Sequence, residues 1–261
     1  MKIALLLSTY NWPEALELVL KSIVQLHMLP DEVLIADDGS TSDTKVVVDR
    51  FRESVPITVT HVWQEDHGFK RSAILNKAIA QSTADYIVQT DGDCILHPNF
   101  IKDHKSSLKK GQFLFGSRVN LIKTGLQPLF ETQNIRFTSF SKGIKNRTRA
   151  IHFPILSNFY GITDQLSKKV RGCNLSFWRD DFIAVNGYNE DMTGWGREDS
   201  EFVIRLLNSG LKGRRLRYKA IIYHIWHKSS SKSKVTINQE IQEATVAQKL
   251  SRCTNGVAKY L

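Results

Sequence analysis

Apolar runs and amphipathic segments alternate along the first ninety residues. A continuous apolar run predicts a strand buried on both faces, and apolar residues at a spacing of three or four predict a helix that packs on one side. Strands that alternate with helices favour a parallel sheet with right-handed crossovers. The predicted strands cover residues 3–7, 32–36, 57–63 and 86–89, and the predicted helices cover residues 14–26, 44–52 and 72–80.

The pattern becomes weaker after Pro98, and residues 120–170 lack strong periodicity. A segment of this kind is typical of short helices and loops. We expect one α/β domain in which a Rossmann-like first half, residues 1–118, continues into a second half, residues 119–261. Further strands are predicted at 113–118, 174–177 and 220–223, and further helices at 200–208 and, at the C-terminus, about 235–250.

The composition is that of an ordinary globular protein, with 41% hydrophobic residues in 261. The run Ile3 to Leu7 is too short for the core of a signal peptide or for a membrane span. The three cysteines are odd in number and lack the spacing of a metal site, which fits a reducing compartment. We therefore expect a cytoplasmic location.

The net charge of +10 is sorted into blocks along the chain. Residues 1–101 carry 8 basic residues (Lys or Arg) and 14 acidic residues (Asp or Glu). Residues 102–171 carry 14 basic and 3 acidic residues, and residues 202–239 carry 9 basic residues and no acidic residue. A uniformly basic coat would favour nucleic acid as the partner. Alternating blocks instead favour a catalytic cleft beside a surface that meets an anionic partner, either an acceptor or peripherally the inner face of an anionic membrane.

Two carboxylates, Asp91 and Asp93, flank Gly92 directly after the apolar run 86–88. Acids at this position lie at the carboxyl end of a strand, where open α/β sheets bind ligands. Two like charges held close together raise each other's pKa unless a cation lies between them. The pair therefore indicates a Mn²⁺ or Mg²⁺ site, although a solvated turn has the same sequence signature.

Two other strand ends carry polar residues. The segment Asp37-Asp38-Gly39-Ser40 follows the second predicted strand, and Ser8 and Tyr10 follow the first. Asp, Gly and Ser are also ordinary turn and cap residues. If the two ends form one site, a carboxylate at 37–38 accepts a hydrogen bond from a nucleobase, and Ser8 and Tyr10 contact or stack on the same base.

Lys70 and Arg71 precede the predicted helix 72–80. The N-terminus of a helix already carries partial positive charge, so two cations there are electrostatically unfavourable. An anion such as a diphosphate between them would make the arrangement favourable. We expect these two residues to bind one.

Taken in this order, the segments at residues 8–11, 37–40, 70–76 and 91–93 resemble the nucleotide-sugar half of family 2 glycosyltransferases with the GT-A fold. The resemblance covers about residues 1–118. It implies that Ser8, Tyr10 and Asp38 hold a uracil, that Asp91 meets the ribose, and that Asp93 binds the metal ion bridging the diphosphate.

The segment Gly194-Trp195-Gly196-Arg197-Glu198-Asp199 resembles the Gly-Trp-Gly-Gly-Glu-Asp segment of β-1,4-galactosyltransferases and related polymerising enzymes such as chondroitin polymerase. The resemblance implies that Trp195 lines the acceptor site, that Glu198 positions the acceptor, and that Asp199 is the catalytic base. Arg197 stands where that family usually has glycine. An acidic first turn of the following helix would also explain the two acids.

Two more features are implied by the resemblance. Arg171-Gly172-Cys173-Asn174 resembles the segment that lines the donor sugar, so Gly172 and Asn174 are assigned there. His224, after the last predicted strand, is assigned as a metal ligand. His227 is the alternative, and a histidine without a ligand role is a further one.

These features predict an inverting, metal-dependent glycosyltransferase of cell-surface polysaccharide or lipopolysaccharide synthesis. Its expected donor is a UDP-sugar, and its expected acceptor is a saccharide or glycolipid. A basic module that binds a polyanion or nucleic acid on an inactive scaffold is the alternative from another class, but three acidic clusters would repel a polyanion. A nucleotidyltransferase would not need the segment 194–199.

Overall fold

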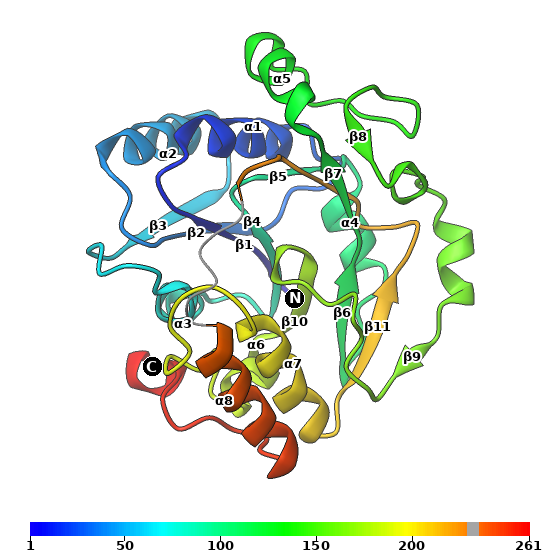
Figure 1. The fold of residues 1–261 in the computed structure, drawn as a ribbon. Helices are drawn as coiled ribbons and strands as arrows, with labels where there is room; N and C mark the ends of the chain where they lie inside the picture. Colours follow the sequence, from blue (N-terminus) through cyan, green and yellow to red (C-terminus); the bar gives the residue numbers. More distant parts are fainter. Residues whose placement is uncertain (229–234) are drawn as a thin grey trace.

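A mixed, eight-stranded sheet forms the centre of the computed structural model, which describes residues 1–228 and 235–261 (Figure 1). The strand order is β3-β2-β1-β4-β10-β6-β11-β9. The first four are parallel, β10 runs antiparallel to both of its neighbours, and β6 and β11 are parallel again. The strands are β1 (Ile3–Thr9), β2 (Glu32–Asp37), β3 (Thr58–Trp63), β4 (Tyr86–Asp91), β6 (Gln112–Gly116), β9 (Ile162–Thr163), β10 (Leu175–Trp178) and β11 (Lys212–Leu216).

A second, smaller sheet has the order β5-β12-β7-β8. It joins the turn after β4 to a late segment of the chain, because β12 pairs with β5 and places His224 opposite Cys94. This sheet therefore brings residues from both halves of the sequence to one place. Its strands are β5 (Cys94–Leu96), β7 (Arg118–Leu121), β8 (Ile144–Lys145) and β12 (Ile222–His224).

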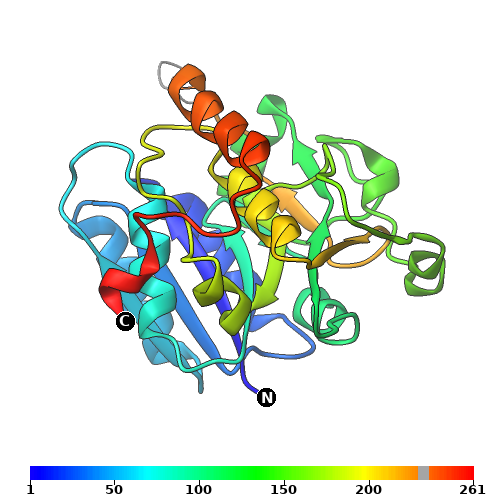
Figure 2. The ribbon, with the colours of Figure 1, turned by 90° about the horizontal axis from the view of Figure 1, so that it is seen from below.

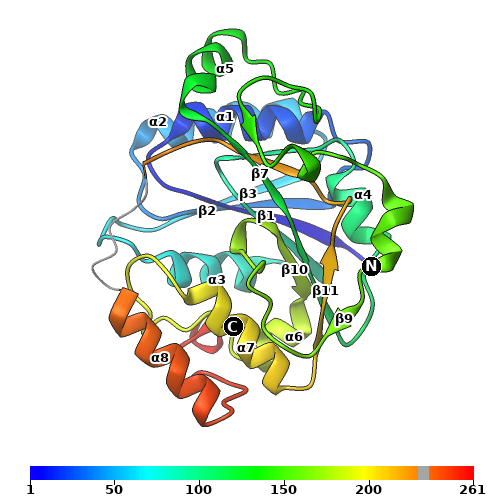
Figure 3. The ribbon, with the colours of Figure 1, turned by 45° about the vertical axis from the view of Figure 1, so that its right-hand side comes forward.

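Helices cover both faces of the large sheet. In Figure 3, α1 and α2 lie on one side of strands β1 to β3, and α3, α6 and α7 lie on the other. Figure 2 shows α8 alongside α7, and the C-terminal end of the chain beside α3. The helices are α1 (Pro13–Val24), α2 (Ser42–Ser54), α3 (Arg71–Gln81), α4 (Phe100–Lys105), α5 (Leu126–Thr132), α6 (Arg179–Ala184), α7 (Glu198–Asn208) and α8 (Val235–Ala247), with 3₁₀ turns η1 (Lys123–Gly125), η2 (Arg147–Arg149), η3 (Pro154–Phe159), η4 (Gly172–Asn174) and η5 (Val257–Tyr260).

The apolar run of β1 is buried on both faces, as the sequence predicts. Leu5 and Leu7 belong to the core under α1 and α2, whereas Ala4 and Leu6 belong to the core under α3. Successive side chains of a strand point to opposite faces, so a continuous apolar run stabilises both layers. The prediction of an α/β fold with a mostly parallel first half is confirmed.

The register of these strands aligns their polar ends. β1 lies between β2 and β4, with Thr9 opposite Asp37 and Ser8 opposite Asp91. Parallel neighbours end at the same edge, so three polar strand ends that are far apart in sequence form one surface.

Some predicted elements are wrong in detail. The strand predicted at 113–118 is two strands, because β6 ends at Gly116 and the chain passes into the smaller sheet at Arg118. The last strand lies at Ile222–His224 rather than 220–223. Helix α7 begins at Glu198, before its predicted start, and the predicted helix 235–250 ends at Ala247.

No helix within residues 1–228 and 235–261 combines the length and the apolar character needed to cross a membrane.

A buried ion pair holds α7 in place. Nε of Arg205 lies 2.8 Å from Oε1 of Glu201, and both side chains are 1% exposed. Thr245 of α8 donates a hydrogen bond to the same Glu201 oxygen at 3.1 Å. Through Thr245 the pair connects α7, which begins with the acidic residues 198–199, to α8.

Replacing Arg205 with leucine is expected to lower the free energy of unfolding by about 3–5 kcal/mol, because it leaves the Glu201 carboxylate buried without its partner. Urea denaturation followed by circular dichroism measures the change. Arg50→Leu is the control, since the Arg50–Glu17 pair is exposed and should contribute at most about 1 kcal/mol. Equal losses in the two variants would contradict the assigned role of Arg205.

Candidate active site

The guanidinium group of Arg71 lies at the centre of the polar edge. Its Nη2 is 2.7 Å from Oδ1 of Asp91, and its Nη1 is 3.1 Å from Oδ1 of Asp199 and 3.4 Å from Oε1 of Glu198. Arg71 begins α3, Asp91 ends β4, and the other two acids begin α7. One largely buried cation thus joins the nucleotide-side strand ends to the acidic segment of the second half.

The carboxylates outnumber this cation. Burial on its own would lower the pKa of Arg71, but the charges of Asp91, Asp199 and Glu198 raise that pKa well above its ordinary value. Burial, together with the charge of Asp199, raises the pKa of Glu198 to about 7. The site therefore holds an excess of negative charge near neutral pH, and Glu198 is the group that relieves it by binding a proton.

Asp199 is fixed on its other side by η4. The backbone N–H of Gly172 donates to Oδ2 of Asp199 at 2.8 Å. A Cβ atom at position 172 would lie 2.2 Å from Oδ1 of Asp199, so a side chain cannot fit there without moving the acid. Glycine at 172 is explained by this close approach.

The protein itself orients Asp38. Its Oδ1 accepts a hydrogen bond from Nε2 of Gln64 at 2.6 Å, and its Oδ2 accepts one from the backbone N–H of Lys70 at 2.8 Å. The adjacent Gly39 has φ +99°, and a Cβ there would lie 2.6 Å from Cα of Asp66. The turn after β2 is therefore packed closely against the loop before α3.

Ser8 and Tyr10 flank this turn in different ways. The Ser8 hydroxyl donates to Oδ1 of Asp91 at 2.9 Å and accepts from Nε of Arg71 at 3.3 Å, so it belongs to the central network. The Tyr10 ring is 52% exposed, and its hydroxyl donates to Asp66 at 2.9 Å. Lys70 lines a separate open cleft of about 330 Å³ beside Trp63.

Asp93 and two histidines form a group suited to a cation. Nε2 of His224 lies 3.5 Å, and Nε2 of His227 lies 3.3 Å, from Oδ2 of Asp93. One ligand atom from each of the three residues lies within 4.8 Å of the others. Both histidines that the sequence offers as alternatives are therefore close enough to share one ion.

The protonation of Asp93 and His224 fits a cation better than that of His227. Burial lowers the pKa of His224, which favours the neutral imidazole that binds metals. The hydrogen bond to Asp93 raises the pKa of His227. For Asp93, burial acts to raise the pKa, but the hydrogen bond from His227 and the charge of His224 outweigh it, so the pKa is lowered and the carboxylate is ionised.

A second group, Asp91 with Cys94 and Cys173, fits a cation less well. Asp91 is already paired with Arg71. Burial raises the pKa of the Cys94 thiol well above its ordinary value, and a protonated thiol is a poor metal ligand.

Trp195 and Asn174 occupy contrasting places. The Trp195 side chain is 42% exposed, in a loop where Gly194, Gly196 and Arg197 all have positive φ. Arg197, at φ +76°, adopts the left-handed conformation that glycine takes at no cost. The Asn174 side chain is 1% exposed and donates to the carbonyl oxygens of Ser117 and Ala220.

Most of the predicted residues thus form two adjoining groups, and Tyr10, Asp38, Lys70, Asn174 and Trp195 lie outside both. The structure brings together Ser8, Arg71, Asp91, Gly172, Glu198 and Asp199 in one network, and Asp93, His224 and His227 in another. Sequence reasoning missed the bridge that Arg71 makes, and it treated the two histidines as alternatives. It also missed Arg118 and Arg149, for which the basic block 102–171 is the signal in the sequence.

Two family models match parts of the chain. The model described as "Glycosyl transferase family 2" matches residues 5–165, and the model described as "N-terminal domain of galactosyltransferase" matches residues 157–228. The chain belongs to glycosyl transferase family 2, and its residues 157–228 are similar to the N-terminal domain of galactosyltransferase.

Curated relatives include chondroitin synthase of Escherichia coli, 24% identical over 85% of this chain and 34% of its own length. Hyaluronan synthase of Pasteurella multocida is 23% identical over 80% of this chain and 23% of its own length. Validoxylamine A glucosyltransferase of Streptomyces hygroscopicus subsp. limoneus is 24% identical over 80% of this chain and 48% of its own length. The chain spans less than half the length of these relatives.

Solved structures share the fold at low identity. S. aureus TarS 1–349 in complex with UDP-GlcNAc has a TM-score of 0.64 at 16% identity, covering 100% of this chain and 69% of that one. The mannosyltransferase PcManGT from Pyrobaculum calidifontis, in complex with GDP-Man and Mn²⁺, has a TM-score of 0.57 at 18% identity. The match covers 95% of this chain and 62% of that one. The fold is of the GT-A type.

The raised pKa of Glu198 predicts a pH-dependent stability. Because the folded-state pKa of about 7 lies above the ordinary 4.5, the folded protein binds more protons than the unfolded chain between these values. Its stability therefore falls as the pH rises through that window. Glu198→Gln should remove this slope. As the pH rises from 4.5 to 7.5, the free energy of unfolding of the variant should therefore increase by on the order of 1–3 kcal/mol relative to that of the wild type.

Chemical denaturation at a series of pH values measures this difference. Glu53→Gln serves as the control because Glu53 is exposed on α2. A Glu198→Gln profile that runs parallel to the wild-type profile would contradict the prediction.

Proposed function

We propose that this protein is an inverting, metal-dependent glycosyltransferase that acts in the synthesis of a cell-surface polysaccharide or lipopolysaccharide. The observation that carries the proposal is the convergence at one sheet edge of Asp199, held by Gly172 and Arg71, with the Asp93–histidine group close by. The family supports glycosyl transfer, and the relatives named as chondroitin and hyaluronan synthases support a polymer as the product.

Residues 1–118 form the donor-binding half in this proposal. Asp38 is oriented at the end of β2 to accept a hydrogen bond from the base, and the exposed Tyr10 ring is placed to stack on it. Ser8 and Asp91 meet the nucleoside, while Lys70 and Arg71 contribute positive charge toward the diphosphate. A UDP-sugar is favoured by the TarS structures that hold UDP and UDP-GlcNAc.

The divalent cation, Mn²⁺ or Mg²⁺, is assigned to Asp93 and His224, with His227 as the alternative or additional ligand. An ionised carboxylate beside a neutral imidazole is a suitable donor set. When bound there, the ion supplies charge neutralisation for the departing diphosphate. A Mn²⁺ ion is named with the PcManGT structure, which supports the assignment.

Residues 119–261 supply the acceptor side. Trp195 offers an exposed aromatic face to the acceptor ring, and Glu198 holds one of its hydroxyl groups. Asp199 takes the proton from the attacking hydroxyl. The acceptor oxygen then bonds to the anomeric carbon of the donor sugar, on the face opposite the breaking bond to the diphosphate. A single displacement of this kind inverts the anomeric configuration, and Gly172 and Asn174 lie beside the sugar that is transferred.

Asp199→Asn should reduce the turnover of glycosyl transfer by about 10²–10⁴-fold, because it removes the general base. Binding of the donor should be unchanged, since the amide keeps the size of the side chain. Release of nucleoside diphosphate from a screen of nucleotide sugars with Mn²⁺ measures turnover. Asp180→Asn, an exposed substitution on α6, is the control. Near-full turnover in Asp199→Asn would contradict the assignment of the base.

Asp93→Ala should weaken Mn²⁺ binding at least tenfold, and His224→Ala should weaken it more than His227→Ala. Electron paramagnetic resonance of free Mn²⁺ measures the affinity without any substrate. His67→Ala is the control, because His67 is exposed and lies outside the group. Unchanged Mn²⁺ affinity in Asp93→Ala would contradict the site, and a larger loss in His227→Ala would reverse the order of the two histidines.

We also propose that the protein works at the cytoplasmic face of an anionic membrane, where a glycolipid acceptor would be present. Exposed apolar side chains within the basic block 102–171 support this, with Ile155 69% and Phe159 82% exposed. Phe159→Ser with Ile155→Ser should reduce co-sedimentation with phosphatidylglycerol vesicles. Val46→Ser on α2 is the control. Equal binding of the wild type to anionic and neutral vesicles would contradict the proposal.

A further inference from the structure

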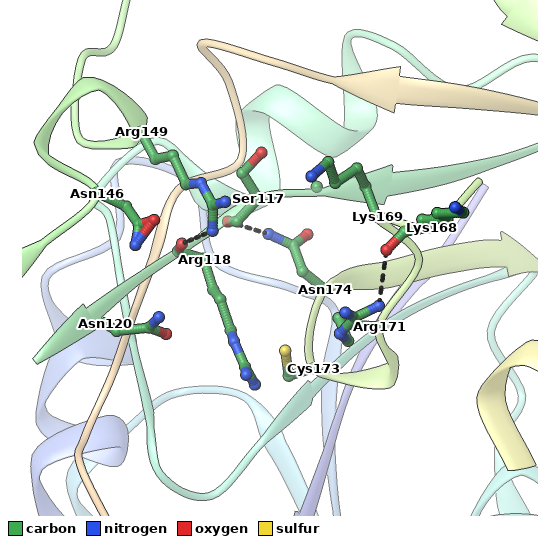
Figure 4. Close-up of a pocket in the computed structure, with 11 residues that line it drawn as sticks. Ser117, Arg118, Asn120, Asn146, Arg149, Lys168, Lys169, Arg171, Cys173 and Asn174 are labelled. Atoms are coloured by element: carbon green, nitrogen blue, oxygen red, sulfur yellow. Dashed lines mark hydrogen bonds between the residues drawn. The ribbon is translucent and has the colours of Figure 1, made fainter. Parts of the chain in front are cut away.

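A pocket of about 200 Å³ opens beside β7 and η4 (Figure 4). Five cationic side chains line it, and no Asp or Glu lines it within the described part of the chain. In Figure 4, Arg149 and Lys169 extend toward Ser117 from opposite sides. The cations come from three separate segments of the sequence and are Arg118, Arg149, Lys168, Lys169 and Arg171.

The cations at this pocket repel one another. Burial and the nearby charges of Arg217, Arg215, Arg118 and Arg171 lower the pKa of Arg149. The hydrogen bonds that hold these groups run to backbone carbonyls, from Arg149 to Arg118 at 3.1 Å and from Arg171 to Lys168 at 3.0 Å. These bonds satisfy donors without compensating the positive charge of Arg149 and Arg171. Arg118 differs, because burial acts to lower its pKa but the charge of nearby Asp91 helps to raise that pKa. A bound anion would stabilise the cluster.

Polar atoms in the pocket wall also lack partners. Ser117 is 9% exposed, yet its Oγ forms no hydrogen bond with the described residues. Oδ1 of Asn120 is buried without a partner as well. Buried polar atoms are normally paired. A hydroxyl group such as Ser117 donates to an anion, and an amide oxygen accepts from a sugar hydroxyl.

The pocket borders both groups of the candidate active site. Asn120 is the register partner of His224 across β7 and β12. At the other end, Cys173 follows Gly172, whose N–H binds Asp199. A molecule in this pocket therefore sits beside both the proposed ion and the proposed base, where the reacting sugars meet.

We infer that this pocket binds an anionic group, a carboxylate or a phosphate, of the acceptor saccharide. The inference rests on the proposed function and specifies the chemical class of its acceptor. The donor diphosphate is already assigned to the Asp93 group, which leaves these five cations for a different anion. A lipid bilayer is a poorer fit, because Ser117 and Asn174 lie in the wall of a recess that a flat surface does not enter.

The test uses direct binding to the full chain, measured by calorimetry with UDP and Mn²⁺ present. The probes are a glucuronic-acid-containing tetrasaccharide, its carboxyl-reduced neutral counterpart and a glycerol phosphate tetramer. The wild type is compared with the double variant Arg149→Gln/Lys169→Gln. The control is Lys45→Gln/Arg50→Gln on α2, which removes the same charge far from the pocket in sequence.

The wild type and the control should bind at least one charged tetramer ten times or more tightly than the neutral one. The Arg149→Gln/Lys169→Gln variant should lose that preference while binding UDP with Mn²⁺ unchanged. The uronate and phosphate arms show which anion the pocket takes.

Equal binding of charged and neutral probes by the wild type, or a preference retained in the double variant, would overturn the inference. A second result would also overturn it. If the wild type binds UDP-glucuronic acid more tightly than UDP-glucose and the double variant does not, the pocket belongs to the donor. Loss of phosphatidylglycerol vesicle binding without any change in tetramer binding would assign it to a membrane. Failure of the wild type to bind any nucleotide sugar or to release its nucleotide would contradict the proposed function itself, separately from these outcomes.

Discussion

The ion-pair network around Arg71 is the interaction on which the arrangement of the site depends. Residues separated by more than a hundred positions in sequence meet at this guanidinium, since Asp91 ends β4 while Glu198 and Asp199 begin α7. Carboxylates brought this close repel one another, and burial strengthens the repulsion. Without the cation these carboxylates would face one another uncompensated, so we expect Asp199 to be held less firmly beside Gly172.

The same network shows how the two halves cooperate. The register of β1, β2 and β4 presents polar strand ends at one edge, and the smaller sheet brings His224 to the turn that carries Asp93. Each half alone contains part of a site. In the folded chain the proposed ion, the proposed base and the cationic pocket adjoin one another, so that binding of a donor and an acceptor would take place on one continuous surface.

Much of the first half could be predicted from the sequence, because β1, β2 and β4 are long apolar runs whose burial decides their structure. The strand ends followed from the same runs, and so did Ser8, Tyr10, Asp38, Asp91 and Asp93, whereas the candidate residues of the second half were assigned by resemblance. β11 could not be predicted, because its sequence Lys-Gly-Arg-Arg-Leu has no apolar alternation and it forms by pairing with β6. The contact between Arg71 and Asp199 was equally hidden, since it depends on the tertiary placement of α3 against α7 rather than on any local pattern.

A double-mutant cycle between Arg71→Gln and Asp199→Asn tests the central claim most directly, with the free energy of unfolding as the measured quantity. If the pair connects the two halves, the effects of the single substitutions should not add. The expected coupling energy is about 1–3 kcal/mol. Additivity to within about 0.5 kcal/mol would contradict the account, because it would mean that Arg71 does not hold Asp199 in place.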